Sequence, residues 1–227
     1  MSENIIETKN IIRTFKTAGN ESFTALNDIS VEIPAGCLTI LKGRSGSGKT
    51  TLMNILGTLD KPTDGKILWD GKDITDISER RGEIMRRSLM GFVFQSVSLI
   101  PMMTVYENVE FALRLSGKKE NMKDRVLECL KYVGLEKRIN HMPAQLSGGE
   151  QQRVAIARAI AHKPHVVFAD EPTAELDTAT SHNIINLFKR LVREEKITIV
   201  MTTHDMSLLN AGDRIYELSD GKLIKGE

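Results

Sequence analysis

Residues 43–50 read GRSGSGKT; they follow the apolar run LTIL and precede the helix-like run TLMNILGTL. The spacing matches the pattern G-x-x-x-x-G-K-[ST], which forms a phosphate-binding loop between a strand and a helix. Glycines in such a loop let successive backbone N–H groups surround the β-phosphate of a nucleotide. Lys49 would reach the β- and γ-phosphates, and the Thr50 hydroxyl would bind Mg²⁺. The stretch predicts nucleotide binding by an α/β fold, with contacts from Gly43, Arg44, Ser45, Gly46, Ser47, Gly48, Lys49, Thr50 and Thr51.

A second motif, VVFADE at residues 166–171, is an apolar strand that ends in two carboxylates. Asp170 at the strand end would hold the Mg²⁺ ion. Glu171 would act as the general base that polarises a water molecule for in-line attack on the γ-phosphate. Two solvated acids at a strand end are the alternative interpretation, because exposed carboxylates are common. The phosphate-binding loop upstream favours the catalytic interpretation.

Two polar residues end further strand-like runs: Gln95 in MGFVFQ and His204 in ITIVMTTH. A neutral amide such as that of Gln95 can bind Mg²⁺ or hold the attacking water without adding charge. His204 could donate a hydrogen bond to the γ-phosphate. Either residue alone would be an ordinary polar strand end. Together with Lys49 and Glu171, they are predicted to form the catalytic set.

The stretch LSGGEQQRVAIARAI, residues 146–160, places two glycines at the start of a regular helical pattern. Glycine is a poor helix former, but at a helix start it leaves backbone N–H groups open to close approach. The N-terminus of a helix also attracts anions. Ser147, Gly148 and Gly149 are therefore predicted to face an anion.

The composition is that of an ordinary globular protein. Of the 227 residues, 41% are hydrophobic and 27% are charged, and the formal net charge of +1 gives no overall field for gripping nucleic acid. No apolar run approaches the roughly 18 residues of a membrane span, and the start of the chain has no signal-peptide pattern. Cys37 and Cys129 lie in apolar surroundings, so we expect buried, reduced thiols and a cytosolic protein.

Strand-like and helix-like segments alternate at both ends of the chain, which indicates an α/β core with a partly parallel sheet. In the piece GKILWDG, Trp69 is expected to lie in a hairpin. Near the other end we expect a helix from about residue 178 to 194 and a closing hairpin that turns at Asp220-Gly221. From about residue 96 to 161 the pattern is helical, as in MKDRVLECLKYVGL, where Gly134 would stop the helix.

Taken together and in the family's order, GRSGSGKT, Gln95, LSGGEQQR, VVFADEPT, AELD and His204 resemble the nucleotide-binding domain of ATP-binding cassette (ABC) proteins. The resemblance runs from about residue 3 to 225, and LSGGE is its most diagnostic part. NILGTLDKPTDGKI and MGFVFQSVSLIPMMTVYENV look most like ATPases of the macrolide-export, lipoprotein-release and cell-division-associated branch.

The fold that this resemblance implies is α/β, a P-loop NTPase core with a mixed sheet, an N-terminal antiparallel β subdomain and an inserted helical subdomain. Residues 1–227 would form one domain. Its ATP-binding core and β subdomain would comprise 1–95 and 162–227, and the helical subdomain about 96–161.

The resemblance also implies that two copies pack head to tail with ATP and Mg²⁺ between them. Residues 147–149 of one copy would cap the ATP held by Lys49 of the other, so that one chain cannot complete its own site. Asp177, in a loop that crosses the interface, would be oriented toward the partner's site. Phe15 would stack on the adenine in place of the tyrosine that is common in the family.

One position departs from the family pattern, because Glu175 stands where a small or neutral residue usually precedes Leu-Asp. An extra carboxylate near phosphates would be repulsive unless a cation paired with it. Glu175 either tunes the closed dimer or points into solvent, as lone surface acids commonly do.

A separate membrane permease is a further implied partner, with a short helix that would enter a groove lined from about residue 96 to 111. Met102, Met103 and Tyr106 offer adaptable apolar contacts there. The alternative, that these residues pack the core of the helical subdomain, stays open. The run SERRGEIMRR interleaves arginines with glutamates, and we expect it to form a solvated helix face.

We therefore expect an ATPase subunit at the cytoplasmic face of the membrane, powering export or extraction of an antimicrobial, peptide or lipoprotein-like substrate through the permease. An extracytoplasmic adaptor is a further candidate partner, and nucleic acid is not expected as one. The first alternative is a cell-division type of ATPase that signals through its membrane partner without transport. A cassette ATPase that acts on nucleic acid or ribosomes fits less well, because the chain has one cassette and no sustained heptads.

Overall fold

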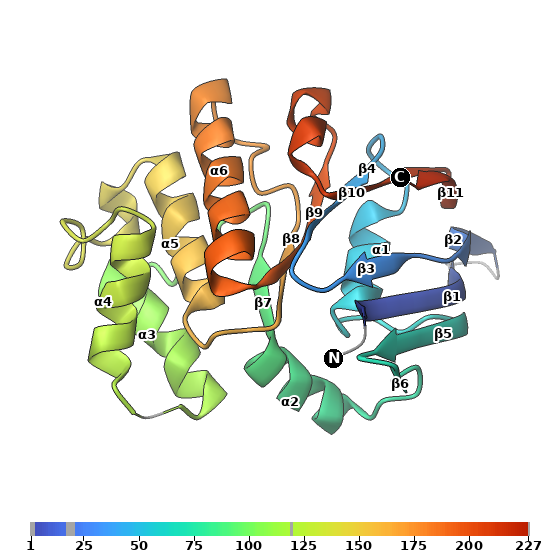
Figure 1. Cartoon of the computed structure of the whole chain (residues 1–227), viewed down its shortest axis with the longest axis horizontal. Coiled ribbons are helices and arrows are strands. Elements are labelled where there is room, and N and C mark those ends of the chain that lie inside the picture. Colours follow the sequence, from blue (N-terminus) through green and yellow to red (C-terminus); the bar gives the residue numbers. More distant parts are fainter. Residues whose placement is uncertain (1–2, 17–20, 119, 227) are drawn as a thin grey trace.

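The computed structural model describes residues 3–16, 21–118 and 120–226 of the chain. Its central feature is a six-stranded sheet in the order β11-β10-β4-β9-β8-β7 (Figure 1). Neighbours from β10 to β7 are parallel, and β11 is antiparallel to β10. Strands β8 and β9 are buried along their whole length, as in parallel sheets that are covered on both faces. The strands are β4 (Leu38–Lys42), β7 (Met90–Val93), β8 (Val166–Ala169), β9 (Thr198–Thr203), β10 (Arg214–Ser219) and β11 (Lys222–Gly226).

A tight turn joins β10 to β11 near the end of the chain. Ser219 pairs with Lys222 across the turn, and the two residues between them, Asp220 and Gly221, have φ angles of 48° and 72°. Two successive positive φ angles are typical of a type I′ hairpin turn, which Asp-Gly favours. The closing hairpin expected from the sequence is confirmed.

A second, antiparallel sheet is built from the N-terminal part of the chain. Its order is β2-β1-β5-β6, and β3 also pairs with β1. Trp69 ends β5, pairs with Lys72 of β6 and is 6% exposed, so it lies in the expected hairpin and packs into the core. The strands are β1 (Asn4–Lys16), β2 (Ser22–Ile29), β3 (Glu32–Pro34), β5 (Asp64–Trp69) and β6 (Lys72–Asp73).

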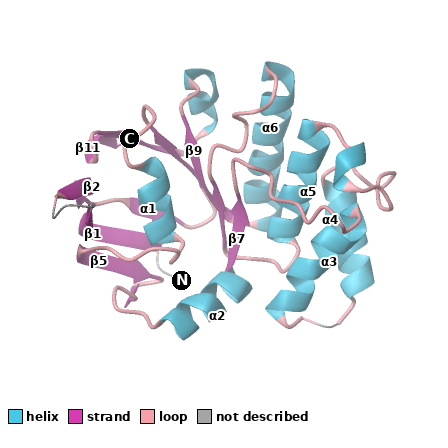
Figure 2. Ribbon diagram, turned by 180° about the vertical axis from the view of Figure 1, so that it is seen from behind, coloured by secondary structure: helices cyan, strands magenta, loops and turns pink. Residues whose placement is uncertain are grey.

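Three helices, α3, α4 and α5, gather at the end of the molecule opposite the antiparallel sheet (Figures 1 and 2); they are called the helical insert below. Helix α4 ends at Tyr132, and Gly134, two residues later, has φ of 72°. Gly134 therefore stops the helix, as expected from the sequence. The helix expected from about residue 178 to 194 is α6, which ends one residue later, at Glu195. The helices are α1 (Lys49–Leu56), α2 (Glu79–Leu89), α3 (Val105–Ser116), α4 (Met122–Tyr132), α5 (Gly148–Ile160) and α6 (Thr178–Glu195), with short 3-10 helices η1 (Pro143–Gln145) and η2 (Met206–Ala211).

The two cysteines differ in their surroundings. Cys129 is 1% exposed in the core of the helical insert, and this burial raises the pKa of its thiol to about 11. Cys37 is only half-buried, because it lies in the turn before β4 rather than in the strand. The expectation of a buried thiol is confirmed for Cys129 and wrong for Cys37.

Candidate active site

The loop between β4 and α1 has a backbone that glycine alone fits at two points. Gly43 has φ of 153°, and a Cβ there would lie 2.3 Å from the carbonyl oxygen of Leu218. Gly48 has φ of 102°, and a Cβ there would lie 2.8 Å from the carbonyl oxygen of Ala25 in β2. The loop therefore lies between the end of β10 and strand β2 of the antiparallel sheet. It leads directly into α1.

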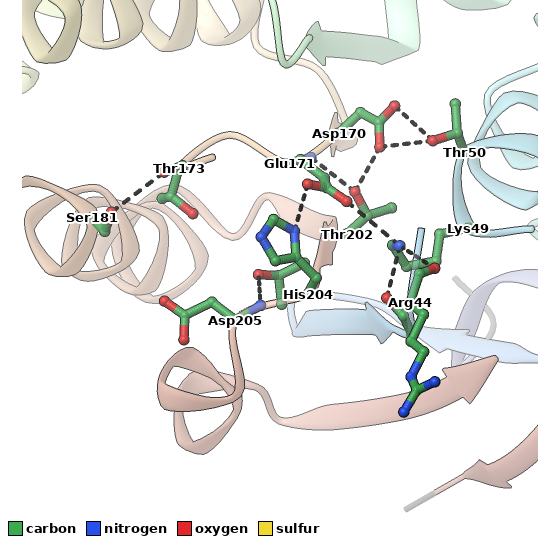
Figure 3. Close-up of polar contacts among 12 residues, drawn as sticks. Arg44, Lys49, Thr50, Asp170, Glu171, Thr173, Ser181, Thr202, His204 and Asp205 are labelled. Carbon is green, nitrogen blue, oxygen red and sulfur yellow. Dashed lines mark hydrogen bonds and ion pairs between the residues drawn. The ribbon is translucent and has the colours of Figure 1, made fainter. Parts of the chain in front are cut away.

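Lys49, the first residue of α1, folds back over this loop. Its side chain is 5% exposed, and its Nζ donates hydrogen bonds to the carbonyl oxygens of Gly43 at 2.9 Å and Arg44 at 3.1 Å (Figure 3). The same Nζ lies 3.5 Å from Oε1 of Glu171. A buried ammonium is thus placed between the loop and the acidic end of β8.

Asp170 follows β8 and contacts two hydroxyls from neighbouring elements (Figure 3). Thr50 Oγ1 donates to its Oδ2 at 3.0 Å, and Thr202 Oγ1 of β9 donates to its Oδ1 at 2.6 Å. The Thr202 hydroxyl in turn accepts the backbone N–H of Glu171 at 2.8 Å. These bonds connect the carboxyl ends of β8 and β9 with the start of α1, so that the motifs of three separate segments meet at one edge of the sheet.

Glu171 has an unusual backbone and two side-chain partners. Its φ of 43° lies in the left-handed region, which costs a residue other than glycine on the order of 1–3 kcal/mol. Its Oε2 lies 2.7 Å from Nδ1 of His204, and its Oε1 faces Lys49 Nζ. The His204 side chain is 60% exposed, so it has one face on Glu171 and the other open to solvent.

Helix α5 begins at the LSGGE string with a complete capping box. Ser147 Oγ accepts the N–H of Glu150 at 3.3 Å, and a Glu150 oxygen accepts the N–H of Ser147 at 2.9 Å. Arg138 pairs with the other Glu150 oxygen at 2.9 Å. The bonds from Ser147 and Arg138 lower the pKa of the Glu150 carboxyl to about 2. The carboxylate of this motif is therefore used to fix the helix start.

Gly149, the second glycine of the LSGGE string, is needed for packing, which the sequence alone does not reveal. A Cβ at Gly149 would lie 2.7 Å from Cγ2 of Thr180 in α6, whereas a Cβ at Gly148 would meet its nearest neighbour, Leu176, at 3.8 Å. Asp177 caps α6 by accepting the N–H of Thr180 at 3.0 Å, and the Thr180 bonds lower the pKa of the Asp177 carboxyl. The starts of α5 and α6 therefore lie side by side.

Three further predicted residues make no hydrogen bond or ion pair with the described residues of this centre. Gln95 lies two residues beyond β7 at the same sheet edge, is exposed and makes no hydrogen bond to another described residue. Phe15 in β1 is 37% exposed, and the guanidinium of Arg13 lies 4.3 Å from its ring centre. Glu175 is exposed and likewise has no hydrogen-bond partner among the residues that the structure describes, which favours the solvent-facing alternative within one copy.

A family model described as "ABC transporter" matches residues 26–174. The chain belongs to the ABC transporter family. It is 44% identical over 228 residues to "Uncharacterized ABC transporter ATP-binding protein MJ0796" of Methanocaldococcus jannaschii, covering 98% of this chain and 97% of that protein. It is 43% identical to "Macrolide export ATP-binding/permease protein MacB" of Syntrophobacter fumaroxidans, of which it spans 31%.

A solved structure extends the similarity of this ABC ATPase to three dimensions. "Dimeric structure of a post-hydrolysis state of the ATP-binding cassette MJ0796 bound to ADP and Pi" matches with a TM-score of 0.88 at 42% identity, covering 98% of this chain and 97% of that chain. The predicted fold class, the membership of the family and the ATPase activity are thereby confirmed.

Sequence reasoning missed one residue of the ATPase site. Thr202 bonds both to the side chain of Asp170 and to the backbone of Glu171. In the sequence it is one of three threonines in the strand-like run before His204. Its position two residues before His204 is a weak signal, because only the pairing of β9 with β8 brings the hydroxyl to Asp170 and Glu171.

The same cassette has an apolar groove of about 500 Å³ between α2 and β7 on one side and α3 on the other. It is called the α2–α3 groove below, and Figure 2 shows the elements around it. Phe94, Phe111 and Leu115 line it, and the first and last of these are 40% and 53% exposed. Within the described part of the chain, no helix is both long and apolar enough to cross a bilayer.

Proposed function

We propose that this ABC ATPase works as a homodimer in which each copy completes the site of the other. The observation that carries the proposal is the position of the α5 start. Ser147 and Gly148 are exposed, and among the described residues no hydrogen bond or ion pair joins 147–150 to the loop at 43–50. An exposed helix N-terminus suits a phosphate, and the dimeric MJ0796 cassette supports a second copy as its source.

The chemical step follows from the residues at the edge of the sheet. Water attacks the γ-phosphorus of ATP, the bond to the β–γ bridging oxygen breaks, and ADP and phosphate leave. Glu171 would accept the proton of the attacking water, and His204, held on Oε2 of Glu171, would donate to the γ-phosphate. Lys49 in the loop and residues 147–149 of the partner would stabilise the charge on the transferred group.

The residues near Asp170 fit a magnesium ion. Mg²⁺ takes oxygen ligands, and the Thr50 hydroxyl and the Asp170 carboxylate already lie 3.0 Å apart at the start of α1. Gln95 at the same sheet edge would add an amide oxygen. When bound, the ion neutralises charge on the phosphates. Phe15 would stack on the adenine with the ring face that Arg13 does not cover.

A membrane permease is the proposed partner of the α2–α3 groove. The groove is apolar and includes part of the range 96–111 expected from the sequence, together with Phe94 and Leu115 outside it. Arg158 fixes its rim by donating to the carbonyl oxygens of Ser98 at 2.7 Å and Val97 at 3.2 Å. Met102 is 86% exposed and available for contact, whereas Tyr106 packs partly against the core of the helical insert.

The proposed work is export or extraction of an antimicrobial, peptide or lipoprotein-like substrate at the cytoplasmic face of a membrane, with an extracytoplasmic adaptor as a further partner. The relative named as a macrolide exporter carries its permease in the same chain, and it supports this branch. The cell-division type of ATPase, which signals without transport, is the alternative. A permease gene beside this one, encoding a large extracytoplasmic domain, would support the branch.

The test of the homodimer compares the ATPase rate per chain at rising protein concentration, with size measurements in ATP, for wild type and Glu171→Gln. We expect the wild-type rate per chain to rise with concentration. Glu171→Gln should lose about 10²–10⁴-fold in rate, because the general base is gone, and accumulate as an ATP-bound dimer. Glu136→Gln, at an exposed carboxylate in the turn after α4, is the control and should keep the wild-type rate. A monomer whose rate per chain is independent of concentration would contradict the proposal.

A further inference from the structure

A second groove, of about 570 Å³, lies between the helical insert and α6. It is called the α4–α6 groove below. The end of α4, the middle of α5 and one side of α6 form its walls, and none of its described lining residues is Asp or Glu. In a chain with a formal net charge of only +1, this is a marked local concentration of positive charge. The cations that line it are Lys131, Arg153, Lys189, Arg190 and Arg193.

Most of this charge is not balanced within the molecule. The side chains of Lys131, Arg153 and Lys189 make no hydrogen bond or ion pair with any other described residue. The nearby Glu194 is shared between Arg190 at 3.7 Å and Arg193 at 3.6 Å. Five cations therefore face one carboxylate, which leaves an excess positive charge for a ligand to neutralise.

The floor of the groove is held in place by contacts between α4 and α6. The guanidinium of Arg190 lies 3.9 Å from the ring centre of Tyr132 and donates to the backbone carbonyl oxygen of Tyr132. The Tyr132 hydroxyl donates to Glu194 at 3.1 Å. A site that is already ordered loses less side-chain entropy when it binds a ligand.

The size and chemistry of the α4–α6 groove select a polypeptide over a small anion. From Asn183 to Arg193 it follows eleven residues of α6, whose ten steps span about 15 Å at the rise of an α-helix. This length equals about four to five residues of extended chain. Arginine forks bind carboxylates with two parallel hydrogen bonds. The amides of Asn183 and Asn186 both donate and accept, as a peptide backbone requires.

Nucleic acid fits this groove less well. Single strands bind on exposed aromatic faces as well as on cations, and Arg190 covers the ring of the aromatic residue in the lining, Tyr132. We infer that the α4–α6 groove binds an acidic segment of a partner protein.

This partner would be distinct from the one in the α2–α3 groove. Arg153 of α5 lines the α4–α6 groove, whereas Arg158 and Ala159 line the α2–α3 groove. Residues five and six positions apart on a helix with 3.6 residues per turn project from roughly opposite sides. Both grooves can therefore be occupied at once, and the inference does not depend on the proposed transport function.

Binding of a fluorescent oligoglutamate peptide to the full chain, measured by anisotropy at low salt, tests the inference. Wild type should bind it, and Arg153→Glu combined with Lys189→Glu should weaken binding by about tenfold or more, because repulsion replaces attraction. The matched control reverses two exposed arginines of α2, Arg80→Glu with Arg81→Glu, and changes the net charge by the same amount. It should stay within about twofold of wild type.

Three outcomes would overturn the assignment: wild type that does not bind, an equal loss in both double variants, or a single-stranded RNA that binds the same groove more tightly than the peptide. An oligolysine peptide of equal length should not bind. If the double reversal unfolds the chain, Arg153→Gln and Lys189→Gln provide milder versions, and each should weaken binding part of the way. Circular dichroism of every variant establishes that the fold is kept.

Discussion

Two basic side chains contact the Glu171 carboxylate from different directions. Lys49 Nζ lies 3.5 Å from one carboxylate oxygen and His204 Nδ1 lies 2.7 Å from the other. A γ-phosphate in the loop would compete for Lys49, since an ammonium pairs with either anion. One oxygen of Glu171 would then be free to accept a proton, while His204 still orients the other.

The proposed stacking of adenine on Phe15 can be tested by substitution. Base–aromatic stacking is worth about 1–3 kcal/mol, so Phe15→Ala should weaken ATP binding by about tenfold, while Phe15→Tyr should keep the wild-type affinity. Phe23→Ala is the matched control, because Phe23 opposes Phe15 across the strands and is 57% exposed. Titration with a fluorescent ATP analogue measures the affinities. Equal losses for Phe15→Ala and Phe23→Ala would contradict a stacking role for Phe15.

At the scale of elements, the start of α5 depends on its contact with α6. A Cβ at Gly149 would press on the Thr180 methyl at 2.7 Å, and the Thr180 hydroxyl is already bonded to Asp177 at 2.6 Å. The methyl therefore cannot turn away without losing that bond. The two glycines of the LSGGE string are therefore in different surroundings. Gly148 is exposed and has room for a side chain, whereas Gly149 lies where α5 and α6 meet.

Two alanine substitutions separate these reasons. Gly149→Ala should lower the free energy of unfolding by about 1–3 kcal/mol, because overpacking forces a shift of α5 or α6. Gly148→Ala, the neighbouring control, should be neutral or slightly stabilising, since alanine is the better helix former and its Cβ would find ordinary contact at 3.8 Å. Urea unfolding measures both. The packing explanation fails if the two variants unfold at the same urea concentration.

The capping box of α5 predicts a dependence of stability on pH. The pKa of Glu150 is lowered from its ordinary 4.5 to about 2 in the folded chain. A lowered pKa contributes stability that is present above 4.5 and is lost as the pH falls toward 2. The unfolding free energies of wild type and Glu150→Gln should therefore converge over this range. Arg138→Gln should show a weaker pH effect than wild type, because the Ser147 bonds remain. Parallel pH profiles of wild type and Glu150→Gln would contradict the assignment.

The sequence predicts a feature when the residues that determine it are close together in the chain. The α6 helix, the Asp220-Gly221 turn and the phosphate-binding loop follow from local spacing, and the structure has them where expected. Thr202 and the contact of Gly149 with Thr180 depend on which strands and helices become neighbours, and no local pattern encodes this. The sequence predicts burial of Cys37 wrongly, because the apolar residues that follow it form β4, while Cys37 itself lies just before that strand. The division of the chain near residues 95 and 161 and the catalytic role of each site residue remain predictions.

Three surfaces of the molecule are proposed to meet different partners. The nucleotide residues lie at the carboxyl ends of β4, β8 and β9, as ligands commonly do in open α/β sheets. The two grooves lie on opposite sides of α5, and its N-terminus carries the residues proposed to reach a second copy. Helix α5 is therefore the element that all three surfaces share.

The proposed permease contact can be tested at Leu115. This residue lies in the last turn of α3, is 53% exposed and lines the α2–α3 groove, so Leu115→Glu places a charge where an apolar partner helix would have to desolvate it. Co-purification with a co-expressed candidate permease should fall by about tenfold or more, whereas the ATPase rate of the isolated chain should not change. Ile224→Glu, at a 62% exposed position in β11 outside the groove, controls for added charge. Retention of the permease by Leu115→Glu, or equal loss in both variants, would place the docking surface elsewhere on the cassette.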